Sequence, residues 1–341
     1  MGGPRVIWNP PSIEQSQVAG IRIFLSAVAV VSVAFVAACS PHYVLSRPLD
    51  IAGIIAPAPS LTKNVLLVSI DGLRPDAIAK FTAPTLQRLI REGSYSLSAR
   101  TIMPSTTLPS HTSMLSGERP EEHGVVWNNV TSAQLETVKF PTLFSVAREH
   151  GYQTAAFFSK AKFSPLQRPG TLDYSQAPGG WFGKWSSERT VDDVRAHLGT
   201  HKPNVLFVHL SDPDSAGHSS GWMSVAYGRA VRDTDTALAL LLSSAEKAYG
   251  AGNYSVIVTA DHGGHNNGHG TADPQDVNIP WIAWGRGVHP GELDDDEIET
   301  IDTAPTVLWL LGVKHPKDWD GSPVTDAFDD ELPPAVAVIA D

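Results

Sequence analysis

The 341-residue chain is almost devoid of cysteine, since Cys39 is the only one. A single thiol excludes an intrachain disulfide and the Cys-rich ligand sets that are common in structural zinc sites. Any metal site in this chain must therefore be built from aspartate, glutamate, histidine or hydroxyl side chains.

Positive charge is also scarce. The chain has 25 Lys and Arg against 36 Asp and Glu, which gives a formal net charge of −11 at pH 7. This balance argues against a general nucleic-acid binder, because such proteins place basic patches against phosphate groups. A small phosphorylated substrate stays possible, since a bound metal ion supplies positive charge locally whatever the overall sign.

The apolar run at residues 23–38 is short for a transmembrane helix, which needs roughly 20 residues. It follows Arg22 and has the character of a signal-peptide core. It ends in "VAAC", which resembles a bacterial lipobox whose cysteine, here Cys39, is lipidated and becomes the mature N-terminus. We predict a leader over 1–39 and an exported protein, periplasmic or at the cell surface, that is lipid-anchored at Cys39. An ordinary signal peptide or a single anchor helix is the alternative.

The rest of the chain divides into three parts. Residues 40–62 are rich in proline and alanine and predict an extended tether. A single domain is expected over 63–326, followed by a C-terminal tail over 327–341.

Secondary-structure patterns in this domain alternate. Continuous apolar segments predict strands buried on both faces, and helical patterns lie between them. The strands are expected at 64–70, 204–210 and 254–260, and the helices at 84–92, 141–149 and 223–247. The alternation predicts an α/β fold, a single domain with a mostly parallel central sheet flanked by helices.

Each predicted strand is followed at once or within a few residues by a carboxylate: Asp71, Asp214 and Asp261. Ligands of open α/β sheets bind outside the carboxyl ends of the strands, so the three aspartates converge there if the strands are neighbours. Three close carboxylates repel one another, which raises their pKa values or requires a cation, and a divalent metal is the simple resolution. The pattern therefore predicts a metal site.

Histidines follow the same acids, at His218, His262, His265 and His269. Aspartate and histidine are suitable zinc ligands, and a set without cysteine is typical of catalytic zinc. Manganese and iron also suit such ligands.

Five motifs together give a strong family signal: "DGLRPD", "PSTTLPSHTSMLSG", "DPDSAGH", "TADHGGH" and "GHGT". In their order and spacing, over roughly residues 63–325, the chain resembles the alkaline phosphatase superfamily. It is most similar to the type I phosphodiesterase/nucleotide pyrophosphatase branch and its phosphonoacetate-hydrolase-like relatives.

The resemblance implies two zinc ions per chain. Their ligands would come from the motif positions, with Asp71, Thr107, Asp261 and His262 on one ion and Asp214, His218 and His269 on the other. His265 is the competing choice for the last position. His269 is preferred because the family pattern is a His-Gly pair shortly before the next strand.

The resemblance also implies a mechanism. Thr107 would be the nucleophile, activated by zinc, and would form a phosphothreonine that water hydrolyses. A helix that begins near residue 108 would direct its first backbone amides towards the phosphate. Asn128 would stabilise the phosphoryl oxygens, with Asn129 as the alternative.

Lys160 and Lys162 follow a predicted strand and resemble the Lys-x-Lys of phosphonoacetate hydrolases. As substrate-binding residues they would favour a monoester or phosphonate dianion over a diester. Two exposed lysines after an edge strand are the alternative.

The expected function is an exported metal-dependent phosphoric ester hydrolase acting on a small phosphorylated substrate, with no nucleic acid as partner beyond nucleotide substrates. A phosphomonoesterase or phosphonate hydrolase is the alternative, and a non-catalytic exported binding lipoprotein is the alternative of another class. A sulfatase is disfavoured because the stretch "TLPSH" lacks a cysteine for formylglycine formation. A phosphoglycerate-mutase-type enzyme is disfavoured as well, because it would use a serine and a large inserted domain for which this sequence has no room.

Overall fold

The computed structural model describes residues 60–131, 134, 139–168, 170–180, 183–293 and 298–329. The predicted leader with Cys39 lies outside these ranges, as do most of the tether and most of the C-terminal tail. Export and lipid attachment therefore stay predictions. Within the described ranges, the model contains no helix with the length and apolar character needed to cross a bilayer.

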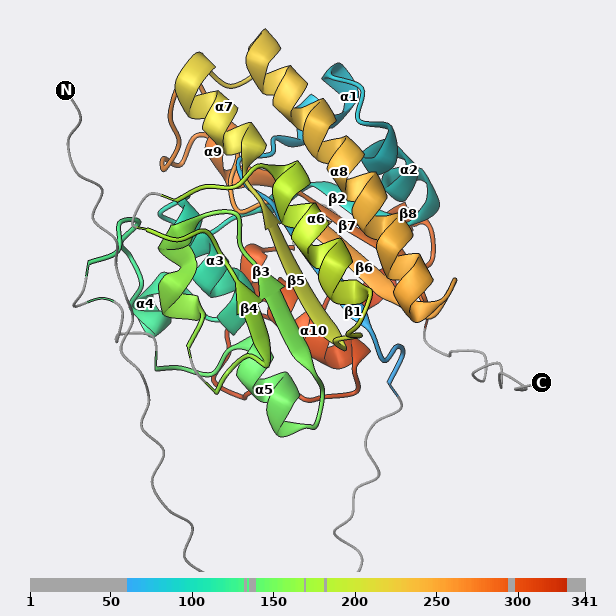
Figure 1. Cartoon of the computed structure of the whole chain (residues 1–341). Helices are drawn as coiled ribbons and strands as arrows, with labels where there is room; N and C mark the ends of the chain where they lie inside the picture. Colours follow the sequence, from blue (N-terminus) through green and yellow to red (C-terminus); the bar gives the residue numbers. More distant parts are fainter. Residues whose placement is uncertain are drawn as a thin grey trace, which may run out of the picture. The chain divides into compact units, whose positions relative to one another are not determined.

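One eight-stranded sheet organises the described residues, in the order β4-β3-β5-β1-β6-β7-β2-β8 (Figure 1). The strands are β1 (Val65–Ile70), β2 (Ser94–Arg100), β3 (Thr154–Phe157), β4 (Tyr174–Gln176), β5 (Val205–Leu210), β6 (Ser255–Thr259), β7 (Asn278–Gly285) and β8 (Gly291–Glu292). The five strands from β4 to β6 run parallel. Only β7 runs against its neighbours β6 and β2. The prediction of a mostly parallel α/β sheet is confirmed.

The three predicted strands lie next to one another at the centre of the sheet, as β5, β1 and β6. Every residue of these strands is buried. Each large aliphatic side chain so buried contributes about 1.5–3 kcal/mol to folding, which explains their continuous apolar sequences. Because the three strands are parallel neighbours, their carboxyl ends meet at one edge of the sheet.

Helices cover both faces of the sheet (Figure 1). They are α1 (Pro75–Lys80), α2 (Pro84–Glu92), α3 (Thr107–Ser116), α4 (Pro120–His123), α5 (Leu143–Glu149), α6 (Ser187–Leu198), α7 (Asp212–Ser220), α8 (Val225–Tyr249), α9 (Pro274–Val277) and α10 (Thr303–Leu310). One layer is built around α8, which contacts α1, α2, α6 and α7, and the other contains α3, α5 and α10. The predicted helices at 84–92, 141–149 and 223–247 correspond to α2, α5 and α8.

Local sequence sets where several helices begin. Side chains of Thr142, Ser186 and Ser224 accept hydrogen bonds from backbone N–H groups in the first turns of α5, α6 and α8. Such caps are worth about 1 kcal/mol each. At α3 the residue Gly117 takes a left-handed conformation (φ 67°) and ends the helix.

Gly72 lies where the carboxyl ends of the three central strands meet. Its φ is +71°, and a Cβ atom there would lie 2.9 Å from the Cα of Asp214. Its backbone N–H donates to Asp261 Oδ1 at 3.1 Å, and the N–H of Asp214 donates to the carbonyl of Asp71 at 3.0 Å. Only glycine permits this approach, which brings the three aspartates together.

Candidate active site

The three aspartates that follow β1, β5 and β6 form one buried cluster. Asp71 and Asp261 are fully buried and Asp214 is 2% exposed. Asp214 lies in the first turn of α7, and Asp261 is fixed by backbone N–H groups of Gly72 and His262 on its Oδ1 atom. The convergence that the sequence predicts is present.

In Asp71 and Asp214, the Oδ2 atom contacts nitrogen atoms of neighbouring side chains. The Lys160 ammonium donates to Asp71 Oδ2 and to Asp214 Oδ2, at 2.6 Å in both cases. His209 Nε2 lies 2.9 Å from Asp71 Oδ2. The Oδ2 side of Asp71 and Asp214 is thus held by protein groups.

The other oxygen of each aspartate has no such partner. Asp71 Oδ1, Asp214 Oδ1 and Asp261 Oδ2 are buried and make no hydrogen bond. Imidazole nitrogens lie beside them: His262 Nε2 at 3.5 Å from Asp71 Oδ1 and 3.2 Å from Asp261 Oδ2, His111 Nδ1 at 3.4 Å from Asp261 Oδ2, and His218 Nε2 at 3.2 Å from Asp214 Oδ1. Buried carboxylate oxygens without a donor are costly, and a bound cation would satisfy all three.

Hydrogen bonds at the far side of each imidazole fix its tautomer. Nδ1 of His218 lies 3.0 Å from the Asn267 carbonyl, Nδ1 of His262 lies 2.8 Å from the Gly263 carbonyl, and Nδ1 of His269 lies 2.9 Å from the Ser105 carbonyl. A carbonyl only accepts, so Nδ1 carries the proton in all three rings. Each Nε2, when unprotonated, would present a lone pair to a bound cation, as in metal-binding histidines.

The ligand atoms are close enough to share cations. Asp71, Asp261 and His262 form one group, and Asp214, His262 and His269 form another, with the ligand atoms of each group within 4.8 Å of one another. His218 adjoins the second group, because its Nε2 is 3.1 Å from Nε2 of His269. The residues fit a two-metal site whose ligands are carboxylate oxygens and imidazole nitrogens.

His265 lies apart from this cluster. Its Nδ1 is 2.7 Å from Asp276 Oδ1, and its backbone pairs with Gly268 across a tight turn. The geometry favours His269 over His265 as a metal ligand.

Thr107 is the first residue of α3 and is 1% exposed. Its hydroxyl oxygen lies 3.4 Å from His262 Nε2. The N-terminal end of α3 carries partial positive charge and favours an anion there. The structure thus places a buried hydroxyl between the carboxylate–imidazole cluster and a helix N-terminus.

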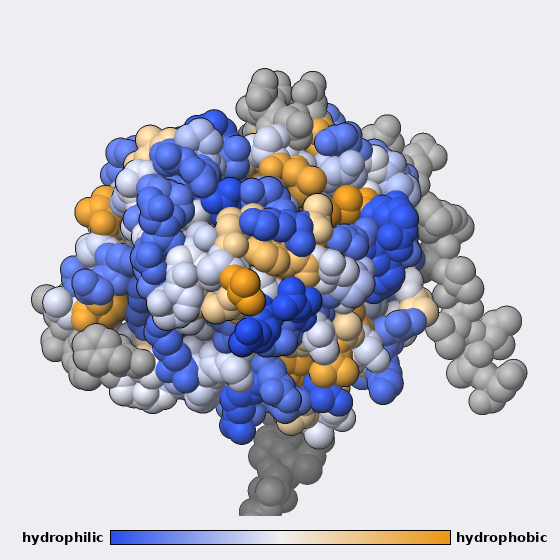
Figure 2. Space-filling view, turned by 90° about the horizontal axis from the view of Figure 1, so that it is seen from above, coloured by the Kyte–Doolittle hydropathy of each residue, from blue (hydrophilic) through white to orange (hydrophobic). Residues whose placement is uncertain are grey.

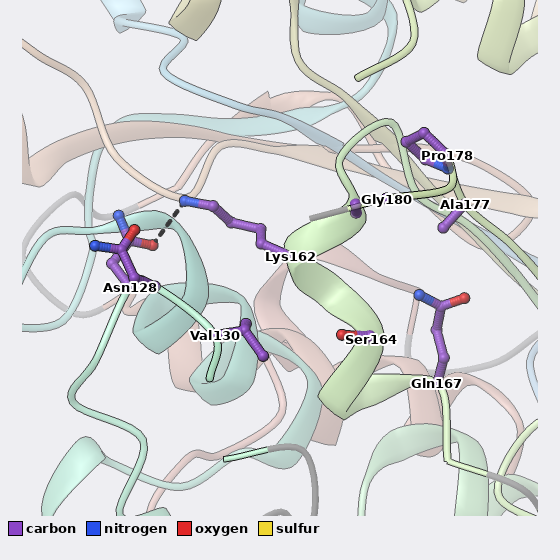
Figure 3. A pocket seen from close by; sticks show the side chains of 10 residues that line it. Asn128, Val130, Lys162, Ser164, Gln167, Ala177, Pro178 and Gly180 are labelled. Carbon is purple, nitrogen blue, oxygen red and sulfur yellow. Dashed lines mark hydrogen bonds between the residues drawn. The ribbon is translucent and has the colours of Figure 1, made fainter. Parts of the chain in front are cut away.

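Asn128 and Lys162 lie near the start of α3. Asn128 Oδ1 accepts from the backbone N–H of Leu108 and from Lys162 Nζ, both at 3.0 Å. The orientation leaves the Asn128 amide nitrogen as a donor. Figure 3 shows Lys162 reaching across to Asn128.

A cavity of about 740 Å³ opens beside this pair. It contains no carboxylate among its described lining residues, which are Asn128, Asn129, Val130, Ala161, Lys162, Ser164, Gln167, Ala177, Pro178 and Gly180. Its size suits an organic group as large as a typical small-molecule ligand. Asn129, the alternative to Asn128, lines the cavity without the contact to α3 that Asn128 makes.

Charge in the cluster is incompletely compensated. Burial alone would raise the pKa of a carboxyl group, yet Lys160 and His209 hold the pKa of Asp71 well below its usual range. Asp261 has no ammonium group bound to it, and burial together with the Asp71 charge raises its pKa well above the usual range. Burial and the neighbouring His269 lower the pKa of His262 to about 3, so this imidazole is neutral. A divalent cation would remove the remaining conflict.

Two buried histidines support the site and were missed by the sequence reasoning. His209 binds Asp71 and, through Nδ1, the Ser159 hydroxyl at 2.8 Å. His111 lies 2.8 Å from both the Thr107 carbonyl and the Ser69 hydroxyl. A histidine inside an otherwise apolar strand, as at 209, is the signal that could have revealed the first.

The face above the carboxyl ends of the strands is mainly hydrophilic (Figure 2). Hydrophobic residues are scattered over it in small groups between polar ones. This distribution suits a site that admits a polar substrate.

Comparison of the sequence with known proteins identifies a matching family and several relatives. The family model for "Type I phosphodiesterase / nucleotide pyrophosphatase" matches residues 65–276. GPI ethanolamine phosphate transferase 1 of Saccharomyces cerevisiae is 24% identical over 315 residues, covering 75% of this chain and 32% of the relative. Ectonucleotide pyrophosphatase/phosphodiesterase family member 3 of Mus musculus is 27% identical over 219 residues, covering 58% and 24%. The chain spans a third or less of the length of these curated relatives.

Solved structures agree on the fold. Murine ectonucleotide pyrophosphatase/phosphodiesterase 5, as an inactive variant in complex with AMP, has a TM-score of 0.64 at 16% identity, covering 78% of this chain and 100% of that chain. The shared architecture is alkaline-phosphatase-like.

Proposed function

Because this chain belongs to the type I phosphodiesterase/nucleotide pyrophosphatase family, we propose that it is a phosphoric ester hydrolase with two zinc ions and a phosphothreonine intermediate at Thr107. The observation that carries the proposal is one constellation. Three carboxylate oxygens without hydrogen bonds and three imidazole Nε2 atoms lie together, and a buried threonine hydroxyl at a helix N-terminus lies beside them.

The ligands would divide as the sequence motifs imply. Asp71, Asp261, His262 and Thr107 would hold one ion, and Asp214, His218 and His269 would hold the other. Zinc bound by these residues would supply the positive charge that lowers the pKa of the Thr107 hydroxyl and neutralises the phosphoryl oxygens.

The chain's own groups then account for the bonds that change. Thr107 Oγ1 loses its proton and bonds to phosphorus, while the bond from phosphorus to the leaving oxygen breaks and that oxygen gains a proton. Water then attacks the phosphothreonine, which returns the threonine hydroxyl and releases phosphate or a phosphomonoester. The N-terminal end of α3 and the Asn128 amide stabilise charge on the phosphoryl oxygens.

The cavity beside Lys162 would hold the organic part of the substrate. It adjoins Asn128, so a group attached to phosphorus would enter it without crossing the metal cluster. Its described lining residues are small apolar side chains, carboxamides, a hydroxyl and the Lys162 ammonium group.

A monoester or phosphonate substrate is the second candidate. Lys162 adds a positive charge next to the residue that would contact the phosphoryl oxygens. A dianion gains more from that charge than a diester monoanion does.

The full chain, loaded with zinc, tests the proposal against p-nitrophenyl phosphate, bis-p-nitrophenyl phosphate, a nucleotide diester and phosphonoacetate under identical conditions. We expect turnover of at least one, with about two zinc ions bound per chain. Product analysis in the presence of an added alcohol distinguishes hydrolysis from phosphoryl transfer.

Thr107→Ala should lower kcat by about 10³-fold or more while zinc stays bound, because it removes the nucleophile. Thr106→Ala is the matched control, since its hydroxyl makes no hydrogen bond although it is the neighbouring residue. Near wild-type turnover in Thr107→Ala would refute the nucleophile, and a protein that binds no zinc would refute the metal site.

A further inference from the structure

Lys160 is in an unusual position for a substrate-binding lysine. It follows β3 directly before the 3₁₀ helix η3 (Ala161–Leu166) and is only 4% exposed. Two of its three N–H donors are taken by Asp71 Oδ2 and Asp214 Oδ2, at 2.6 Å each. These short charge-assisted bonds tie it to Asp71, which follows β1, and to Asp214 in the first turn of α7.

The bonds of Lys160 divide each carboxylate into two sides. In Asp71 and Asp214 the Oδ2 atom faces the ammonium group, and the Oδ1 atom, which has no hydrogen bond, faces the imidazoles. Lys160 therefore leaves the oxygens that face the histidines available. It also joins an aspartate of one expected ligand set to an aspartate of the other.

Lys162, two residues later, is placed differently. Its ammonium group is 3.0 Å from Asn128 Oδ1 and lines the cavity (Figure 3). The two lysines of the motif thus have different hydrogen-bond partners. One faces the carboxylate cluster, and the other faces the cavity next to Asn128.

We propose that Lys160 is a positioning residue, a built-in counter-ion that holds Asp71 and Asp214 at a fixed spacing for the metal ions, while Lys162 alone faces the substrate. The identity of the two aspartates as metal ligands rests on the proposed function. The counter-ion role does not, because it concerns the metal-free protein, in which three buried carboxylates share one ammonium group.

Thermal unfolding of the full chain at pH 8 in EDTA tests this role without any measurement of turnover. Lys160→Met keeps the length of the side chain and removes its charge. We expect the Tm of the metal-free protein to fall by about 10 °C, because a buried charge pair that loses one partner is strongly destabilising. Lys162→Met is the matched control and should change the Tm by no more than about 2 °C.

Zinc gives the second readout. Added zinc supplies the missing positive charge, so the rise in Tm on zinc addition should be larger in Lys160→Met than in the wild type. A substrate-binding lysine would instead leave the metal-free Tm unchanged or raise it and would alter only KM. That result overturns the proposal, and so does a Tm loss of equal size with and without zinc, which would indicate packing.

The double variant Lys160→Met/Asp214→Asn keeps the proposal testable if the single variant does not fold without metal. Removal of one carboxylate should restore at least half of the lost Tm, because the charge imbalance is smaller. A double variant no more stable than Lys160→Met overturns the counter-ion role. If the wild type neither binds zinc nor turns over substrate, the proposed function fails while the metal-free comparison still decides the role of Lys160.

Discussion

Asp261→Asn is expected to stabilise the metal-free protein and to weaken its response to zinc. The substitution removes the one cluster carboxylate that has no ammonium partner. Its Oδ1 atom would keep the backbone N–H groups of Gly72 and His262. The new amide nitrogen would lie where Oδ2 is now, 3.2 Å from the lone pair of His262 Nε2. The side chain can therefore be replaced without loss of hydrogen bonds.

The magnitude follows from the charges. Ligand atoms of Asp71 and Asp261 lie within 4.8 Å of each other, and two unit charges at that distance repel by about 3.5 kcal/mol at an effective dielectric constant of 20. At pH 8 the folded protein either tolerates this repulsion or takes up a proton on Asp261, and both cost free energy. After allowance for the attraction of Lys160, we expect a gain of about 1–3 kcal/mol, or about 3–8 °C in Tm.

The sign of the pH dependence follows from the raised pKa of Asp261, which burial and the Asp71 charge cause. A carboxyl group whose pKa is higher in the folded than in the unfolded state loses stability as pH rises towards the folded value. The gain from Asp261→Asn should therefore be larger at pH 8 than at pH 5. In the presence of zinc the order reverses, since the variant lacks a ligand.

Differential scanning fluorimetry in EDTA at both pH values, followed by a zinc titration, measures these effects. Asp276→Asn serves as a control for removal of a buried aspartate near the site, since Asp276 binds His265 and Thr271 rather than the cluster. A lower metal-free Tm in Asp261→Asn, or a zinc response equal to that of the wild type, would refute the electrostatic reasoning.

Two further predictions concern single side chains. His269→Ala should lower zinc content and reduce kcat/KM by about 100-fold or more, whereas His265→Ala should change both by less than about threefold. The reason is that His269 Nε2 lies at the cluster, 3.7 Å from Asp214 Oδ1, whereas His265 binds Asp276. Metal analysis and kinetics on the same preparations check this, and equal losses would contradict the choice of ligand. Glu118 has its pKa raised to about 7 by burial and by Asp318 and Asp320. Its contribution to stability is therefore lost as pH rises from about 4.5 through 7, and Glu118→Gln should gain about 1–2 kcal/mol over the wild type at pH 8 but little at pH 5. Urea unfolding at the two pH values measures the difference, and an equal effect at both would contradict it.

The sequence was sufficient for the strands and for the aspartates that follow them. Segments such as 64–70 are apolar at nearly every position, which indicates a strand buried on both faces, and the parallel arrangement then brings Asp71, Asp214 and Asp261 to one edge. The start of α3 at Thr107 lies within one residue of the helix start expected near residue 108. These features depend on local sequence and on a simple topological rule.

The surroundings of those residues were less accessible from the sequence. Lys160 lies 89 residues from Asp71 and 54 residues from Asp214 in the sequence, yet contacts both. Nothing in a Lys-x-Lys pattern distinguishes the lysine that faces the cluster from the one that faces the cavity. His111 and His209 act through buried contacts with residues on other elements. Such pairings depend on the packed tertiary structure rather than on periodicity.

The division between cluster and cavity also bears on the choice between hydrolysis and transfer. In the proposed mechanism both reactions would share the first step at Thr107 and would differ only in whether water or an alcohol attacks the phosphothreonine. The carboxylate and imidazole groups serve either outcome equally. The acceptor must instead reach phosphorus from the open side of the site, where Lys162, Asn128 and the cavity of about 740 Å³ lie. Substitutions of cavity residues such as Gln167 and Ser164 should therefore change the ratio of hydrolysis to transfer, while substitutions in the cluster should reduce both together.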